Sequence, residues 1–112
     1  MSEYLPSPTC RRALGLAIAC IAALAAGCGG ARLPAAAELS SSPEEVAMLD
    51  QGRSLCVERC GTCHRLHSPA SLSAEKWPGR VASMAKRAKI DAVQQELITA
   101  YLVKARTIPV AP

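Results

Sequence analysis

Five consecutive residues constrain this chain more than any others, because their order prescribes what the fold must enclose. They read Cys60-Gly61-Thr62-Cys63-His64, the C-x-x-C-H pattern through which a haem is attached covalently to a protein. Two thiols form thioether links to the haem, and the adjacent histidine binds its iron. Without the histidine, the same cysteines would suggest a thiol redox pair or half of a zinc site. The motif therefore predicts a domain built around one haem c.

The composition agrees with a core that needs such a group. Among 112 residues only Trp77, Tyr4 and Tyr101 are aromatic, and phenylalanine is absent. Domains shorter than about 70 to 80 residues rarely stabilise themselves by apolar packing alone, and a bound haem would add a large, flat apolar body. The net charge of +4 is modest, and no basic stripe carries interleaved aromatics, so a nucleic-acid partner is not expected.

The beginning of the chain has the composition of an export signal. An alanine-rich apolar run covers 13–26 and follows Arg11 and Arg12. As a helix it would span about 21 Å, which is short for a hydrocarbon core of roughly 30 Å and favours a secretory signal over a membrane span. The run closes with the letters LAAGC, which resemble the lipobox of bacterial lipoproteins and end at Cys28. There, cleavage falls before the cysteine that carries the lipid.

We therefore expect a lipoprotein-type signal peptide at 1–27 and a lipid on Cys28. The alternative is an ordinary signal peptide, with Cys28 left free. Residues 28–42 lack sustained periodicity, and we expect them to form a flexible tether. The expected location is the periplasmic side of a bacterial membrane, and Gly29 slightly favours the outer one. Export supports the haem interpretation, because bacteria attach haem c outside the cytoplasm.

Helical periodicity and capping signals divide the remaining chain into three helices. They are expected over 43–60, 73–86 and 91–106. The first has Ser42 as its cap, Pro43 in the first helical position and Glu45 at capping-box spacing. The last repeats this spacing with Asp91 and Gln94. No segment alternates like a strand, so the expected fold class is all-α, with about three helices packed around the haem.

The spacing G-x-x-L-x-x-x-x-C-x-x-C-H, from Gly52 to His64, resembles the N-terminal helix of class I-type cytochromes c. In that family the first and last helices cross where a glycine faces an aromatic ring. Gly52 and Tyr101 would take these roles here, because a residue without a Cβ lets two backbones approach closely. Cys56 departs from the family, which often has tyrosine or phenylalanine at this position, and we expect it to be a small buried residue.

The resemblance covers about 43–106 and is strongest to the compact monohaem domains found in bacteria. It implies a cytochrome c domain over 43–108, followed by a tail at 109–112. It also implies a second iron ligand from the opposite haem face, where Met84 matches the family position. Trp77 is expected at the haem edge, as an apolar filler or as an N–H donor to a propionate.

Other residues compete for contacts with the haem. Met84 could instead be an ordinary core residue. Met48 lies on the first helix, on the proximal side, so a core role is expected for it. His67 follows His64 too closely to reach round the ring and is expected to face solvent. A backbone carbonyl near Pro69 is a candidate acceptor for the second ring N–H of His64.

Two arginines of the second helical region have two alternative expected roles. Arg80 and Arg87 either pair with haem propionates or remain solvated on the surface of their helix.

The expected function is single-electron transfer between redox protein partners by an exported, membrane-anchored c-type cytochrome. Such a protein is not an enzyme and takes no small-molecule substrate, although it can serve a dehydrogenase or oxidase as partner or subunit. A second hypothesis is a haem-based sensor or small haem enzyme with an open distal site, in which Met84 does not bind iron. A third has no haem, and Cys60 and Cys63 form an exported dithiol or part of a metal site.

Overall fold

The computed structural model describes residues 31–109, and every regular element within this range is helical. The α-helices of this range are α2 (Ala36–Leu39), α3 (Pro43–Leu55), α4 (Trp77–Ala88) and α5 (Ala92–Ala105). The all-α prediction is therefore confirmed for the described part. The predicted signal peptide at 1–27 and the lipid site at Cys28 lie outside it. No helix between residues 31 and 109 has the length and apolar character needed to cross a membrane.

The start of α3 is capped as predicted on one side only. The Ser42 hydroxyl accepts a hydrogen bond from the Glu45 N–H at 3.5 Å, and Pro43 occupies the first turn. The Glu45 carboxylate does not complete the box. It accepts hydrogen bonds from Lys104 Nζ at 2.8 Å and from the Ser40 hydroxyl, which together lower the pKa of Glu45. Glu45 thus ties the start of α3 to the end of α5.

The other helix boundaries follow local signals. α3 continues into a π-helical turn, Cys56–Cys60, whose last residue begins the C-x-x-C-H motif. α4 follows a 3₁₀ turn, Ala74–Lys76, and has Pro78 in its first turn, where a missing N–H does no harm. α5 begins at a complete capping box: the Gln94 N–H donates to Asp91 Oδ1 at 2.8 Å, and the Asp91 N–H donates to Gln94 Oε1 at 3.0 Å.

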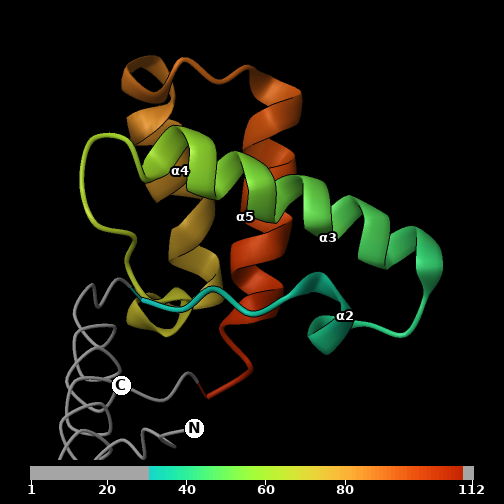
Figure 1. Cartoon of the computed structure of the whole chain (residues 1–112). Coiled ribbons are helices and arrows are strands. Elements are labelled where there is room, and N and C mark those ends of the chain that lie inside the picture. Colours follow the sequence, from blue (N-terminus) through green and yellow to red (C-terminus); the bar gives the residue numbers. More distant parts are fainter. Residues whose placement is uncertain (1–30, 110–112) are drawn as a thin grey trace, which may run out of the picture.

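The three longer helices pack around one hydrophobic core. Figure 1 shows α3 lying across α5, with α4 beside α5. At the crossing, a Cβ added to Gly52 would lie 2.2 Å from the Leu97 carbonyl oxygen and 2.9 Å from Tyr101 Cβ. The predicted contact between Gly52 and Tyr101 is confirmed, and its physical reason is the close approach of two backbones. The most buried core residues are Leu49, Ile98, Tyr101 and Ala105.

Residues 31–42 differ from the flexible tether that we expected. Three of their side chains are buried: Leu33, Pro34 and Ala36. The Tyr101 hydroxyl, also buried, donates a hydrogen bond to the Pro34 carbonyl oxygen at 2.7 Å. Figure 1 shows this segment running beneath the helices toward α2. An alanine-rich stretch without periodicity does not reveal such packing, because the acceptor is a backbone carbonyl and the donor lies 67 residues away.

The substitution Tyr101→Phe should loosen residues 31–42 while keeping the ring in the core. It leaves the Pro34 carbonyl without its donor, which should cost about 1–3 kcal/mol. Burial raises the pKa of Tyr101 to about 12 from 10.0. The unfolded chain therefore loses this proton first, so wild-type stability should fall as the pH rises from about 10 to 12. Urea unfolding at about pH 8 and pH 11 measures both effects. If Tyr101→Phe lost as much stability as the wild type between about pH 8 and pH 11, the Tyr101 hydroxyl would not be the cause of the alkaline loss.

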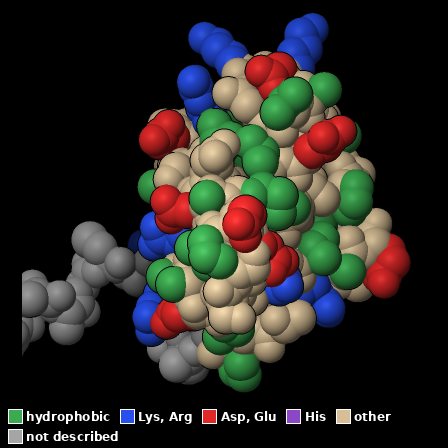
Figure 2. Space-filling model, turned by 90° about the vertical axis from the view of Figure 1, so that its right-hand side faces the viewer, with side chains coloured by type: hydrophobic (Ala, Val, Ile, Leu, Met, Phe, Trp, Pro, Cys, Tyr) green, Lys and Arg blue, Asp and Glu red, His purple; other side chains and the backbone are tan. Residues whose placement is uncertain are grey.

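The surface away from the motif is mixed in character. Figure 2 shows hydrophobic side chains in small patches between acidic ones, with Lys and Arg gathered toward the edges. The exposed large hydrophobic residues of the described part are Met48, Val57 and Val93. No histidine is visible in this view, although His64 and His67 are both exposed. The motif therefore opens on another face of the molecule.

Candidate functional site

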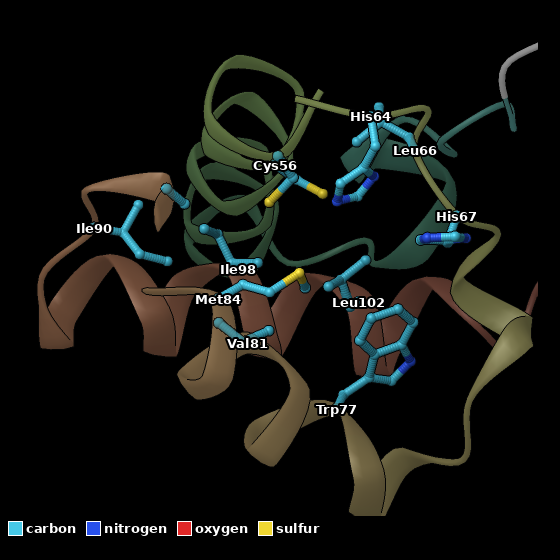
Figure 3. A pocket seen from close by; sticks show the side chains of 12 residues that line it. Cys56, His64, Leu66, His67, Trp77, Val81, Met84, Ile90, Ile98 and Leu102 are labelled. Carbon is cyan, nitrogen blue, oxygen red and sulfur yellow. The ribbon is translucent and has the colours of Figure 1, made fainter. Parts of the chain in front are cut away.

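A pocket lies between the end of α3, the loop that follows it, α4 and α5 (Figure 3). Its empty volume of about 460 Å³ includes open solvent on its exposed side. The lining is mostly apolar and consists of Cys56, Cys60, His64, Leu66, His67, Trp77, Val81, Met84, Ala88, Ile90, Ile98 and Leu102. We call this the central pocket.

Cys60 and His64 of the C-x-x-C-H motif line one wall of this pocket. Cys60, half-buried, ends the π-helical turn and lines the central pocket together with His64. Cys63 is exposed and lines an adjoining hollow, which shares Cys60, His64 and Met84 with the central pocket. Figure 3 shows the His64 ring pointing into the central pocket. The fold thus brings the three predicted attachment residues to one continuous concave surface.

The hydrogen bonding of His64 sets the form of its ring. Nδ1 lies 2.8 Å from the Arg65 carbonyl oxygen, which can only accept a hydrogen bond. An Nδ1–H that donates there leaves Nε2 with a lone pair, the state in which imidazole binds metals. The predicted acceptor near Pro69 is therefore wrong. His67 is exposed, as expected, but it also lines the central pocket. The centroid of its ring lies 5.2 Å from the centroid of the His64 ring.

Met84 lies on the wall opposite the motif. It projects from α4, is half-buried, and lines the central pocket and both hollows beside it. Figure 3 shows its side chain facing His64 across the pocket. Met48, by contrast, is 39% exposed on α3, so the core role expected for it is wrong. Among the methionines of the described part, the geometry singles out Met84 as a candidate second ligand.

Trp77 lines the pocket with its ring but does not present its N–H there. The indole is buried, and Nε1 donates to the Pro69 carbonyl oxygen at 3.0 Å. The N–H bond to a haem propionate that we considered is therefore replaced by a bond within the protein. A buried N–H needs a partner, and the 3₁₀ turn Pro69–Ser71 supplies one. Trp77 remains an apolar filler of the pocket wall.

A third thiol belongs to the site. Cys56 is 3% exposed and lines the central pocket beside Cys60. A hydrogen bond from Cys56 lowers the pKa of Cys60 to about 7, against the opposing effect of burial. The same hydrogen bond, together with burial, raises the pKa of Cys56. The sequence holds a signal for this pair, since residues four apart share one side of a helix.

The reactivity of Cys60 in the haem-free chain provides a test of this pair. Alkylation of Cys60 by iodoacetamide should rise through about pH 7, and Cys56→Ala should move the midpoint up toward the ordinary 9.0. Mass spectrometry of tryptic peptides separates Cys56 from the motif, and fragmentation of peptide 60–65 distinguishes alkylation at Cys60 from alkylation at Cys63. Cys63, in the same peptide as Cys60, is the internal control, because Cys56→Ala should leave its rate unchanged. An identical Cys60 midpoint in both proteins would contradict the hydrogen bond.

The rim of the site carries only positive charge. Arg59 and Arg87 line the hollow beside Cys63, and Arg80 lines the hollow beside Trp77. No acidic residue lines the central pocket or either of these hollows. A cationic rim around an apolar interior suits a flat apolar group that bears carboxylates at its edge.

A metal site formed by side chains alone is not seen in this part of the chain. Within residues 31–109, no group of three or more His, Cys, Asp and Glu residues is placed to hold a metal ion. Comparison with protein-family models, curated proteins and solved structures finds no match to this chain.

Proposed function

We propose that this chain is an exported, membrane-anchored c-type cytochrome that transfers single electrons between protein partners. The observation that carries the proposal is that Cys60 and His64 lie on one wall of an apolar pocket, with Met84 on the opposite wall and Cys63 in the adjoining hollow (Figure 3). Cys60 and Cys63 would hold haem c through thioether bonds, and His64 and Met84 would bind its iron. When bound, haem supplies one-electron chemistry.

The residues present fit such a group in three respects. Apolar walls, among them Trp77 and Val81, would keep water from the haem faces. The arginines of the rim would balance the negative propionates. A histidine and a methionine on opposite sides would fill both axial positions, which leaves no place for a substrate and supports electron transfer over catalysis. A thioether ligand also raises the reduction potential relative to two histidines.

The membrane anchor belongs to the proposal because it rests on the sequence of 1–28. If lipid is attached at Cys28, the chain from there to the buried Leu33 reaches at most about 17 Å. The folded domain would then sit close to the membrane, on the periplasmic side, with the outer membrane slightly favoured. Its partners would be redox proteins within that reach, such as a dehydrogenase or oxidase, and neither a nucleic acid nor a small-molecule substrate.

Mass spectrometry of the protein produced in a bacterium that attaches haem c tests the proposal. One spectrum reports the haem mass, the lipid mass and the new N-terminus together. The double variant Cys60→Ser, Cys63→Ser should lose covalent haem, whereas Cys56→Ala should retain it. A wild-type chain that carries no haem, with an intact motif and a competent host, would refute the proposal. It would favour the dithiol hypothesis.

A further inference from the structure

The two hollows beside the central pocket have different walls and share only Met84. The cysteine hollow is lined by Arg59, Cys60, Cys63, His64, Met84, Arg87 and Ala88. The tryptophan hollow is lined by His67, Ser71, Leu72, Trp77, Arg80 and Met84. On α4, Arg80 precedes Met84 by about one turn and Arg87 follows it by about one turn. The two hollows therefore lie toward opposite ends of α4, and each brings one arginine of that helix to the site.

We propose that Arg80 binds the propionate carboxylates of the haem in the tryptophan hollow, and that Arg59 and Arg87 do not contact them. This inference rests on the proposed function, because it concerns the haem that the function requires. In a haem, the two propionates lie on the edge opposite the two groups that react with cysteines. An edge joined to Cys60 and Cys63 therefore directs the carboxylates away from the cysteine hollow, which both of these residues line.

The apolar interior does not suit the carboxylates. On its inner side the central pocket is lined by Ile98 and Leu102, which are 0% and 4% exposed. An ionised carboxylate buried there without a partner would be strongly destabilising. The tryptophan hollow is bordered by exposed residues and offers the guanidinium of Arg80, a group that binds a carboxylate through two parallel hydrogen bonds.

Hydrogen bonds hold the walls of the tryptophan hollow in place, whereas the Arg80 side chain remains available. Trp77 Nε1 donates to the Pro69 carbonyl oxygen at 3.0 Å, and Arg106 Nε donates to the Leu72 carbonyl oxygen at 3.2 Å. These bonds tie the loop before α4 to α4 itself and to the end of α5. Within residues 31–109, the Arg80 guanidinium makes no hydrogen bond or ion pair. A carboxylate could therefore bind Arg80 without breaking a contact of the protein.

Resonance Raman spectroscopy of the full-length holoprotein tests the assignment through the bending vibration of the propionates, whose frequency depends on their hydrogen bonds. Arg80→Gln should shift this band from its wild-type position. Arg80→Lys, which keeps the charge but not the two parallel bonds, should shift it less. Arg87→Gln is the matched control on the same helix and should leave the band unchanged. An unchanged band in Arg80→Gln, or a shift in Arg87→Gln alone, would overturn the assignment.

Chemical labelling of the haem carboxylates provides a second measurement. Carbodiimide couples glycine amide to accessible carboxylates, and trypsin, which cleaves after Arg59 and Arg65, releases the labelled haem on peptide 60–65. Labelling should be several-fold faster in Arg80→Gln than in the wild type, and Arg87→Gln should match the wild type. Equal rates in all three proteins would also overturn the assignment.

The mass of the purified protein distinguishes failure of this inference from failure of the proposed function. A wild-type protein isolated without covalent haem would refute the proposed function and this inference with it. A wild-type protein that carries covalent haem, but whose propionates respond equally to Arg80→Gln and Arg87→Gln, would overturn the role of Arg80 alone.

Discussion

The substitution Gly52→Ala is expected to lower the free energy of unfolding by about 3 kcal/mol, although alanine is the better helix former. The new Cβ would lie 2.2 Å from the Leu97 carbonyl oxygen, 2.9 Å from the Leu97 carbonyl carbon and 2.9 Å from Tyr101 Cβ. Two of these contacts are with backbone, which cannot rotate away like a side chain. α3 and α5 must separate instead. Overpacking of a core typically costs 1–3 kcal/mol, and occasionally more, so the upper end is expected here.

Gly79 provides a matched control on α4. A Cβ added there meets nothing within 4 Å, so Gly79→Ala should stabilise the protein by about 0.5–1 kcal/mol through helix propensity alone. Urea unfolding of the wild type and both variants measures the two effects under one condition. Equal effects of the two substitutions would show that the crossing of α3 and α5 tolerates a side chain at Gly52.

In the proposed cytochrome, replacement of Met84 should change the haem iron more than any other single substitution outside the C-x-x-C-H motif. In the holoprotein, Met84→Ala is expected to convert a six-coordinate, low-spin spectrum to one with an open position that binds CO rapidly. The reduction potential should fall by on the order of 0.1 V, given that axial ligands set potentials over roughly 0.8 V. The physical reason is the loss of the thioether, which favours ferrous iron.

Two further substitutions separate ligation from packing. Met84→Leu keeps the volume of the side chain but removes the sulfur, so it should reproduce the spectrum of Met84→Ala if Met84 binds iron. Met48→Ala, at a site 39% exposed on α3, should leave both the spectrum and the potential unchanged. A wild type that is already high-spin and binds CO rapidly would favour the sensor or enzyme with an open distal site.

The helix boundaries show how much a linear pattern can predict. Ser42 and Asp91 each cap a helix where the spacing of polar residues indicated a start. Such caps join groups two or three residues apart, so their partners are already present in the sequence. The predicted partner of Glu45 was wrong, because Lys104 competes for its carboxylate from 59 residues away. The spacing of a capping box in the sequence does not show that a side chain from another helix will bind the same carboxylate.

The candidate site also combines features that neighbouring residues predict with features that depend on residues far apart in the sequence. The order of Cys60, Cys63 and His64 is a property of five consecutive residues, and their position on one concave surface follows from the end of a single helix. The bond from Trp77 to the Pro69 carbonyl depends on how a loop returns to α4. The residue types of Trp77 and Pro69 do not predict this hydrogen bond, since any backbone carbonyl is an acceptor.

By itself, the sequence determined the helical class, the starts of α3 and α5, the C-x-x-C-H motif and the glycine that allows two helices to touch. These rest on local hydrogen bonds and on side-chain periodicity. Only the tertiary structure decided that Leu33 and Pro34 are packed on the domain, that Met84 and not Met48 faces the motif, and that Cys56 lines the same pocket as Cys60. The reason is that burial and partner choice depend on which surfaces meet, and neighbours along the chain do not record this.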